Sequence, residues 1–561
     1  MRLITIYLLT IIFSIQAVRA QKPEAIKWAD SVLQSLTLKE RVAQLMVVRS
    51  SQPNAMLDKH IDSLVEKYNI GAICAFQGTP LQHATMFNRI QEKAKTPIMV
   101  TVDGEWGLGM RFTGVNNLPY QLTMGALPNA GQVYRAGEII ARQCRRMNIH
   151  VNYAPVVDIN NNPNNPVIGL RSFGEDKYKV ALFGTRIMEG MQDNHIMACA
   201  KHFPGHGDVA VDSHYDLPVI KKTKEQLDSL ELYPFKQLIA HGVQSVMVAH
   251  LSIPAIDTTP NRPTSLSPAN INGLLRKDLG FAGLTFTDAL EMKGVSKFFP
   301  SGEAAVQSLI AGNDMLCLPE DVPASINAVL NAIDSGLISE TYLNEKCRKV
   351  LLAKYEYVKD YVEPVFITDL LKDLNAEVDT FRAAVAEKSL TVLAMPETFS
   401  FLQKQDSLKT VYINLGAKAN STISASFADT YNIDIIDLPF TNSSAIDNFN
   451  VKQLQKYDRV VVALHGVTRS TAKNFGIPAS AIKLIKAIDK TGKPTLNMVF
   501  GNPYIIAQLD SVKGLVACYE DDVMFRENAY KWLTGSFDAS GTLPVTIGKY
   551  PFGSGIVKKK S

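Results

Sequence analysis

The segment "KHFPGHGDVAVDSH", residues 201–214, concentrates side chains that can transfer protons or bind metal ions near neutral pH. It holds three of the chain's ten histidines and two aspartates, without helical or strand periodicity. In an extended chain alternate side chains face the same way, so we expect Asp212 and His214 to point together. A neighbouring carboxylate fixes the tautomer of an imidazole and raises its pKa, which makes His214 a candidate proton donor.

A second motif, "FTDALEMKG", places Asp288 directly after a short apolar run. Asp288 is a candidate nucleophile or electrostatic base. One carboxylate and one proton donor across a sugar-sized gap are the minimum for glycoside hydrolysis by double displacement.

Two other interpretations of the histidine-rich segment compete with proton transfer. His202, His206, His214 and Asp212 could bind a metal ion, but their spacings match no familiar zinc pattern. The histidines could instead be structural groups that shape a long loop, and for His206 this interpretation is as good as a functional one. We expect no metal ion and no cofactor.

Eight short apolar runs precede or contain these candidates, and helical patterns separate them. Strands that alternate with helices predict parallel βαβ units, and eight units over residues 40–355 predict a (β/α)8 barrel. The runs are "AQLMVVRS" at 43, "IGAICAF" at 70, "PIMVTVDG" at 97, "IHVNYAPVVD" at 149, "MACAKHFPG" at 197, "QSVMVAHL" at 244, "GLTFTDAL" at 283 and "NDMLCLP" at 313.

Polar residues follow these runs where a barrel forms its active site, at the C-terminal ends of the strands. Together they predict one rim around the barrel mouth. They are Asp103, Asp158, Lys201, His202, His250 and Asp288.

A second α/β pattern begins at "SLTVLAM" and predicts five or six parallel strands in a smaller doubly wound sandwich. It carries no glycine-rich phosphate-binding fingerprint. The predicted organisation is a signal peptide at 1–20, the barrel at 21–355, a helical linker at 356–388, the sandwich at 389–555 and a tail at 556–561.

The first twenty residues predict export. Arg2 precedes an uncharged apolar run, and "VRA" offers small residues at a cleavage position, so we expect a secreted or periplasmic protein without a stable membrane span after removal of the signal. Loss of Arg2 and Arg19 lowers the formal charge from +4 to +2, which argues against a nucleic-acid partner. Six scattered cysteines indicate no disulfide framework, and the oligomeric state is left open.

These motifs resemble family 3 glycoside hydrolases, specifically the bacterial β-N-acetylglucosaminidase branch. "KHFPGHGDVAVDSHYDLP" resembles the signature loop of that branch, and "GFAGLTFTDALEMKGV" resembles its nucleophile segment. "RSFGED", "MVAHLSIPAID", "AGNDMLCLP" and "GNPY…GTLPV" are also similar, so the resemblance runs from about residue 30 to 550.

The resemblance implies a role for each candidate residue. Asp288 would be the nucleophile, His214 the acid/base and Asp212 its partner. The sugar hydroxyls next to the broken bond would be bound by Asp103, Arg111, Arg171, Lys201 and His202. The chain departs from the family pattern at "DGEWGLGMR", where Trp106 replaces a glycine and puts the shape of the pocket wall in question.

The leading hypothesis is a retaining, exo-acting β-N-acetylglucosaminidase of peptidoglycan fragments or related glycans, with a carbohydrate as its partner. Another β-glycosidase, or a phosphorylase on the same scaffold, is the alternative among enzymes. A phosphorylase stays open because an imidazole is neutral after proton donation and opposes an anionic acceptor less than a carboxylate would. A non-catalytic glycan-binding protein is a third reading, which the intact candidate catalytic residues disfavour.

Overall fold

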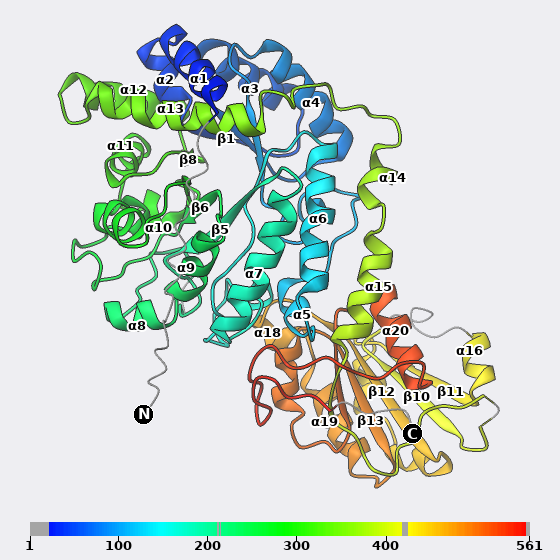
Figure 1. Ribbon diagram of the computed structural model, residues 1–561. Helices are drawn as coiled ribbons and strands as arrows, with labels where there is room; N and C mark the ends of the chain where they lie inside the picture. Colours follow the sequence, from blue (N-terminus) through cyan, green and yellow to red (C-terminus); the bar gives the residue numbers. More distant parts are fainter. Residues whose placement is uncertain (1–21, 210–211, 214, 405, 418–424, 557–561) are drawn as a thin grey trace, which may run out of the picture.

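The computed structural model describes residues 22–209, 212–213, 215–404, 406–417 and 425–556. Two α/β bodies follow one another along the chain. The first is blue to green in Figure 1 and the second is yellow to red, with α14 and α15 running between them. Among the described residues, no helix is long and apolar enough to cross a membrane.

Eight strands of the first body form the predicted barrel, with each strand inside the apolar run that predicts it. They pair in parallel in the order β7-β6-β5-β4-β3-β2-β1-β8, and a bridge between Phe286 and Met315 joins the two ends. The strands are Met46–Ser50 (β1), Ala72–Ala75 (β2), Met99–Val102 (β3), Val151–Asn152 (β4), Met197–Phe203 (β5), Ser245–Val248 (β6), Leu284–Thr287 (β7) and Leu316–Cys317 (β8).

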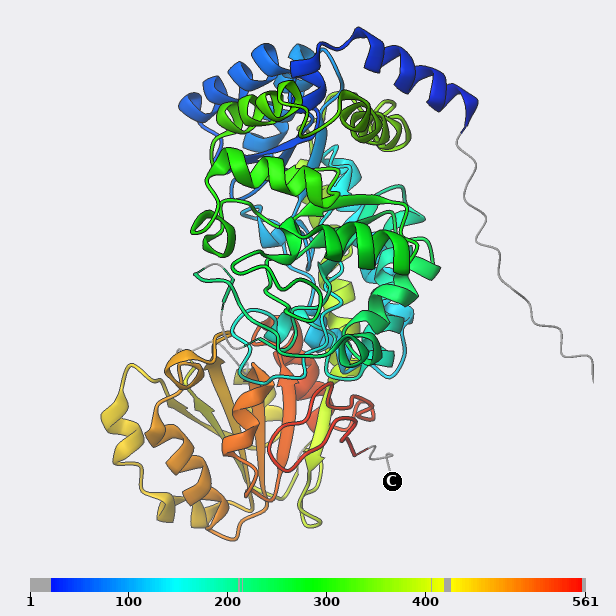
Figure 2. The ribbon, with the colours of Figure 1, turned by 90° about the vertical axis from the view of Figure 1, so that its left-hand side faces the viewer.

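Helices surround this barrel because its strands bury side chains on both faces. In β2 all four residues "AICA" are buried, as is typical of a strand between a packed interior and a helical layer. The helices are α1 (Pro23–Ser35), α2 (Leu38–Ala43), α3 (Ala55–Tyr68), α4 (Pro80–Lys93), α5 (Gln121–Gly125), α6 (Gly131–Arg146), α7 (Lys177–Gln192), α8 (Lys224–Ser229), α9 (Leu232–Ala240), α10 (Lys293–Ser296), α11 (Ser301–Ala311), α12 (Val322–Asp334) and α13 (Glu340–Tyr357). Figure 2 shows α1 projecting from one side of the barrel.

Local sequence fixes where several of these helices begin. Thr79 starts α4 with a capping box, in which its hydroxyl accepts a hydrogen bond from the Gln82 N–H at 3.2 Å and Gln82 accepts one from the Thr79 N–H at 2.9 Å. Asp321 caps α12 by accepting from the Ala324 N–H at 2.9 Å. These caps hold the helix starts next to the strand ends that form the barrel mouth.

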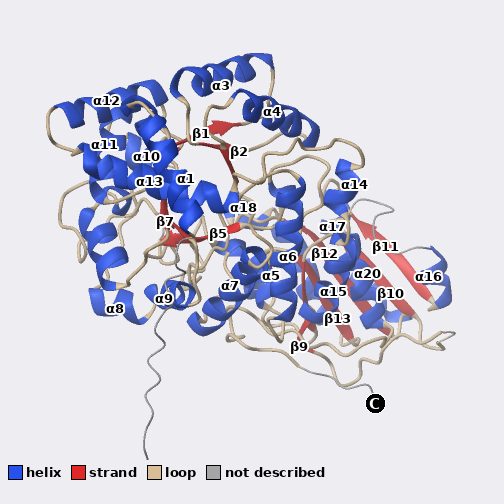
Figure 3. Ribbon diagram, turned by 45° about the horizontal axis from the view of Figure 1, so that its top comes forward, coloured by secondary structure: helices blue, strands red, loops and turns tan. Residues whose placement is uncertain are grey.

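The connection between the two bodies contains two helices, α14 (Leu370–Asn375) and α15 (Val378–Ser389). The second body is a six-stranded sheet in the order β11-β10-β12-β13-β14-β9. Its strands, red in Figure 3, are β9 (Thr391–Ala394), β10 (Thr410–Leu415), β11 (Ile433–Leu438), β12 (Arg459–Val467), β13 (Thr495–Gly501) and β14 (Leu515–Tyr519). Its helices are α16 (Ala425–Thr430), α17 (Ser443–Asp447), α18 (Ala472–Phe475), α19 (Ala479–Asp489) and α20 (Val523–Leu533).

The prediction that all these strands are parallel is wrong for β9, which pairs antiparallel with β14 at the edge of the sheet. An antiparallel edge strand on a parallel sheet is common, and an apolar run does not encode its own direction. The doubly wound character is confirmed. Alternate residues of β12 pack on opposite faces, with Val462 in the apolar cluster of α19 and Val461 in that of α20.

Direct hydrogen bonds hold the second body against the barrel. The buried Glu520, just after β14, accepts bonds from the Tyr120 N–H at 2.8 Å and the Thr123 hydroxyl at 2.9 Å. Asn160 of the barrel donates to the Tyr504 hydroxyl at 2.9 Å. Because these partners lie beyond the C-terminal ends of strands in both bodies, the second body sits beside the barrel mouth.

Candidate active site

Three of the predicted hydroxyl-binding residues form one ion-paired group at the mouth. Asp103 lies directly after β3, and its carboxylate accepts bonds from Lys201 Nζ at 2.7 Å and Arg111 Nη2 at 3.0 Å. Burial raises the pKa of Asp103, but Lys201 and Arg111 outweigh burial and hold it below its ordinary value. Asp103 is therefore an ionised acceptor in a charged wall, suited to the hydroxyls of a sugar.

Sequence reasoning missed the residue that links this group to its neighbour. Glu105 is fully buried and accepts two bonds from Arg171, at 2.9 and 2.7 Å, while Lys201 lies 2.8 Å from one of its oxygens. Burial opposes ionisation, yet Arg171 and Lys201 hold the pKa of Glu105 far below its usual range. The only signal in the sequence is an acid two positions after Asp103, and its partner Arg171 is distant in the chain.

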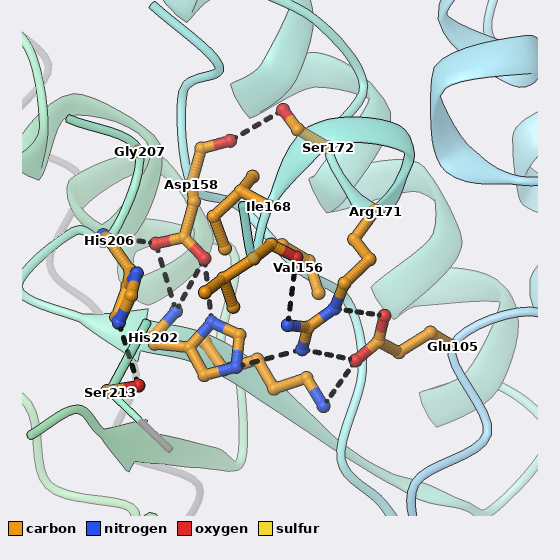
Figure 4. Close-up of polar contacts among 12 residues, drawn as sticks. Glu105, Val156, Asp158, Ile168, Arg171, Ser172, His202, His206, Gly207 and Ser213 are labelled. Atoms are coloured by element: carbon orange, nitrogen blue, oxygen red, sulfur yellow. Dashed lines mark hydrogen bonds and ion pairs between the residues drawn. The ribbon is translucent and has the colours of Figure 1, made fainter. Parts of the chain in front are cut away.

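The tautomer of His202 follows from its two partners (Figure 4). Arg171 Nη2 lies 3.1 Å from His202 Nε2, and a guanidinium can only donate, so Nε2 accepts. Nδ1 therefore carries the proton and donates to Asp158 at 2.7 Å. Both ring nitrogens of His202 are thus engaged by protein groups.

Asp158 also organises the start of the histidine-rich segment. It accepts the His206 N–H at 2.6 Å, and the His206 ring bonds through Nε2 to the Ser213 hydroxyl at 3.2 Å. Burial lowers the pKa of His206 to about 4. His206 is thus a neutral buried residue that connects the two ends of the segment.

Asp288 lies directly after β7, as predicted, and differs from the other carboxylates in its partners. Its side chain accepts a bond from the Ala289 N–H at 2.8 Å. Burial opposes ionisation, but His250 and the Ala289 N–H lower the pKa of Asp288 to about 2. Within the described ranges no Lys or Arg forms an ion pair with Asp288, so it is ionised at neutral pH without a cation bound to it.

The loop that carries Asp212 turns instead of running extended. The Asp212 carbonyl accepts from the N–H groups of Tyr215 at 3.0 Å and Asp216 at 3.2 Å. His214 lies outside the described residues, so its pairing with Asp212 stays a prediction.

One cavity of about 300 Å³ brings most of the predicted residues together. Its walls include all five predicted hydroxyl-binding residues together with Asp212 and Asp288. Other lining residues include Glu105, His206, Trp106 and Arg469. Arg469 belongs to the second body. Trp106, the departure from the family pattern, is nearly buried and forms part of the wall. His250 bonds to Ser265 at 2.7 Å and is not among the lining residues.

The side-chain contacts do not favour the metal interpretation. Both ring nitrogens of His202 are engaged, one with Asp158 and one with Arg171, and His206 bonds to Ser213. Across the part of the chain that the structure describes, no group of three His, Cys, Asp or Glu side chains could hold a metal ion.

A buried ionised carboxylate at a barrel mouth, surrounded by charged donors and acceptors, is suited to chemistry on a sugar. Comparison with known proteins gives the family: residues 37–353 match the glycosyl hydrolase family 3 N-terminal domain. The chain therefore belongs to glycoside hydrolase family 3 and is a glycoside hydrolase, which confirms the resemblance.

Relatives match both bodies. The structure of a family 3 β-N-acetylglucosaminidase from Paenibacillus sp. str. FPU-7 is similar with a TM-score of 0.73 and 32% identity, covering 91% of this chain and 99% of that one. The β-hexosaminidase A of Pseudoalteromonas piscicida is 25% identical over 88% of this chain and 91% of its own length. A β-hexosaminidase of Thiobacillus denitrificans is 35% identical over 42% of this chain and 67% of its own.

Proposed function

We propose that this hydrolase is a retaining, exo-acting β-N-acetylglucosaminidase, with Asp288 as its nucleophile. The observation that carries the proposal is the difference between the carboxylates of the cavity. Asp103 and Glu105 are each bound by two cations, whereas Asp288 is ionised and, among the described residues, accepts a hydrogen bond only from the Ala289 N–H. A nucleophile needs an unprotonated oxygen with a lone pair free to attack, and Asp288 meets this requirement.

The paired carboxylates have a complementary role. Each is fixed by buried cations, so the wall can accept and donate hydrogen bonds to hydroxyl groups without reorganising. We assign Asp103, Arg111, Arg171 and Lys201 to the binding of the terminal sugar. His202, whose ring nitrogens bond to Arg171 and Asp158, would hold the Arg171 guanidinium in place at this site. Two relatives match most of the chain, and they are named as a β-N-acetylglucosaminidase and a β-hexosaminidase. Their names support an N-acetylated amino sugar as the terminal sugar of the substrate.

Proton transfer is assigned to His214, with Asp212 as its partner. Asp212 lines the same cavity as Asp288, which supports a proton donor within the same site. We further propose peptidoglycan fragments as substrates and an extracytoplasmic site of action, which rest on the leader-like sequence at 1–20 and on the amino-sugar assignment.

The test is a panel of 4-nitrophenyl β-glycosides that differ only at the C2 substituent. We expect the acetamido sugar to be hydrolysed with the highest kcat/KM, and proton NMR to show the β-anomer as the first product. Preference for the 2-hydroxy sugar would overturn the acetamido assignment. A sugar 1-phosphate formed in added inorganic phosphate would show phosphorolysis in place of hydrolysis.

A further inference from the structure

Arg469 is contributed to the cavity by the second body, and neither a motif nor the proposed mechanism accounts for it. It follows the end of β12 and is exposed, unlike Lys201, which lines the same cavity and is buried. Its guanidinium lies 5.3 Å from the centre of the Trp106 ring and 5.5 Å from that of Tyr120. Those two rings contact each other edge to face at 5.0 Å.

The aromatic pair gives the guanidinium a fixed place at the mouth of the cavity. A guanidinium that lies over aromatic rings keeps its N–H groups available at its edge. Its Nη1 is 3.5 Å from the Tyr120 hydroxyl, which is the outer limit for a hydrogen bond. Most of its donors therefore remain for another partner.

The backbone of Arg469 is also fixed, through a chain of bonds that begins in the barrel. Asn160 of the barrel donates to the Tyr504 hydroxyl at 2.9 Å, and the Tyr504 N–H donates to Asn502 at 3.1 Å. Asn502 in turn donates to the Arg469 carbonyl at 2.9 Å. The contact between the two bodies thus sets the position of Arg469.

Arg469 differs from the other cations of the cavity in its ion pairing. Arg111, Arg171 and Lys201 each pair with Asp103 or Glu105. No carboxylate among the described residues forms an ion pair with Arg469.

The acids of the neighbouring interdomain cavity, which Arg469 also lines, are engaged elsewhere. Glu520 and Asp522 pair with Arg382, and Asp521 pairs with His465 at 2.8 Å and Arg526 at 2.7 Å. These acids are therefore not the partners of Arg469, and its guanidinium can pair with an acidic group of a bound ligand.

We infer that Arg469, held over Trp106 and Tyr120, is a specificity residue that binds an oxyanion on the glycan. The second body would then contribute directly to substrate selection, and Trp106 would serve as the platform for the guanidinium. This inference rests on the proposed N-acetylglucosaminidase activity. In a peptidoglycan fragment the oxyanion would be the lactyl carboxylate of the leaving sugar; an acidic group on the terminal sugar would offer the same chemistry.

The experiment compares substrates that differ in charge alone. The first pair is N-acetylglucosaminyl-β-1,4-N-acetylmuramic acid and the same disaccharide with its carboxylate converted to the methyl amide. The second pair is 4-nitrophenyl β-N-acetylglucosaminide with and without a 6-O-sulfate. For Arg469→Gln we expect kcat/KM for the anionic member of one pair to fall ~10–100-fold further than for its neutral partner, because a charge-assisted hydrogen bond is lost. The loss should appear mainly in KM.

Two variants make the test specific. Lys473→Gln removes the same charge from an exposed position in the same segment, and we expect it to affect both members of a pair equally. Arg469→Lys keeps the charge but loses the planar fork, and should fall between wild type and Arg469→Gln.

The outcomes separate the inference from the proposed function. Selectivity for the muramyl pair places the oxyanion on the leaving sugar, and selectivity for the sulfated pair places it on the terminal sugar. Equal losses for charged and neutral substrates, no loss at all, or the same selectivity in Lys473→Gln would overturn the inference. A wild type that fails to hydrolyse the neutral aryl N-acetylglucosaminide would instead refute the proposed function.

Discussion

Replacement of Glu105 by glutamine should destabilise the barrel as well as impair catalysis. The side chain is fully buried and lies between two cations, Arg171 at 2.7 Å and Lys201 at 2.8 Å. Glutamine keeps the shape but removes the charge, so the cations lose a shared counter-ion and face an N–H₂ group. Removal of one partner from a buried ion pair costs about 3–5 kcal/mol in the free energy of unfolding.

The matched control is Glu291→Gln. Glu291 also pairs with an arginine of the barrel, Arg49, but their side chains are 35% and 38% exposed. A pair of this kind contributes ~0–1 kcal/mol. Denaturant unfolding followed by tryptophan fluorescence should therefore separate the two variants clearly.

The pH dependence provides a second check. Because the folded-state pKa of Glu105 is depressed below its ordinary value of 4.5, its stabilising contribution is present above that value and is lost as the pH falls toward the folded-state pKa. The difference between wild type and Glu105→Gln should thus be constant from pH 6 to 8 and shrink only in strong acid. A variant no less stable than Glu291→Gln would refute the counter-ion role of Glu105.

Three further predictions concern catalysis and the interface between the two bodies. Asp288→Ala should lower kcat by about 10³-fold or more, and near-normal turnover by a folded variant would remove Asp288 from the nucleophile role. His214→Ala should lower the pre-steady-state rate of glycosylation far more for glycosides with poor leaving groups than for activated aryl glycosides, and a chelator should leave the wild type unaffected. Equal losses of rate for both kinds of substrate would contradict general acid catalysis. Burial raises the pKa of Glu520 to about 7, so its contribution to stability is full below pH 4.5 and is lost as the pH rises through 7. Glu520→Gln should accordingly raise the thermal midpoint at pH 8 more than at pH 5, and an equal shift at both would exclude this titration.

The sequence was sufficient to predict the elements of the barrel because apolar runs and strand ends are local signals. All eight strands lie within the predicted runs, and Asp103 and Asp288 directly follow β3 and β7. The direction of a strand and the pairing of residues distant in the chain are not local signals. The antiparallel direction of β9 and the contact of Glu105 with Arg171 were therefore missed. Arg469 had no signal at all, since only the docking of the second body brings it to the cavity.

Two of the three histidines of residues 201–214, His202 and His206, lie within the described residues, and both have fixed partners there. His202 is hydrogen-bonded on both sides, to Arg171 and to Asp158, and His206 is buried with its ring bonded to Ser213. Burial lowers the pKa of His206 to about 4, so His206 is not a proton donor near neutral pH. If this segment supplies the acid/base group, the crowding of histidines therefore reflects a division of roles, in which two build the site and the proton transfer falls to His214.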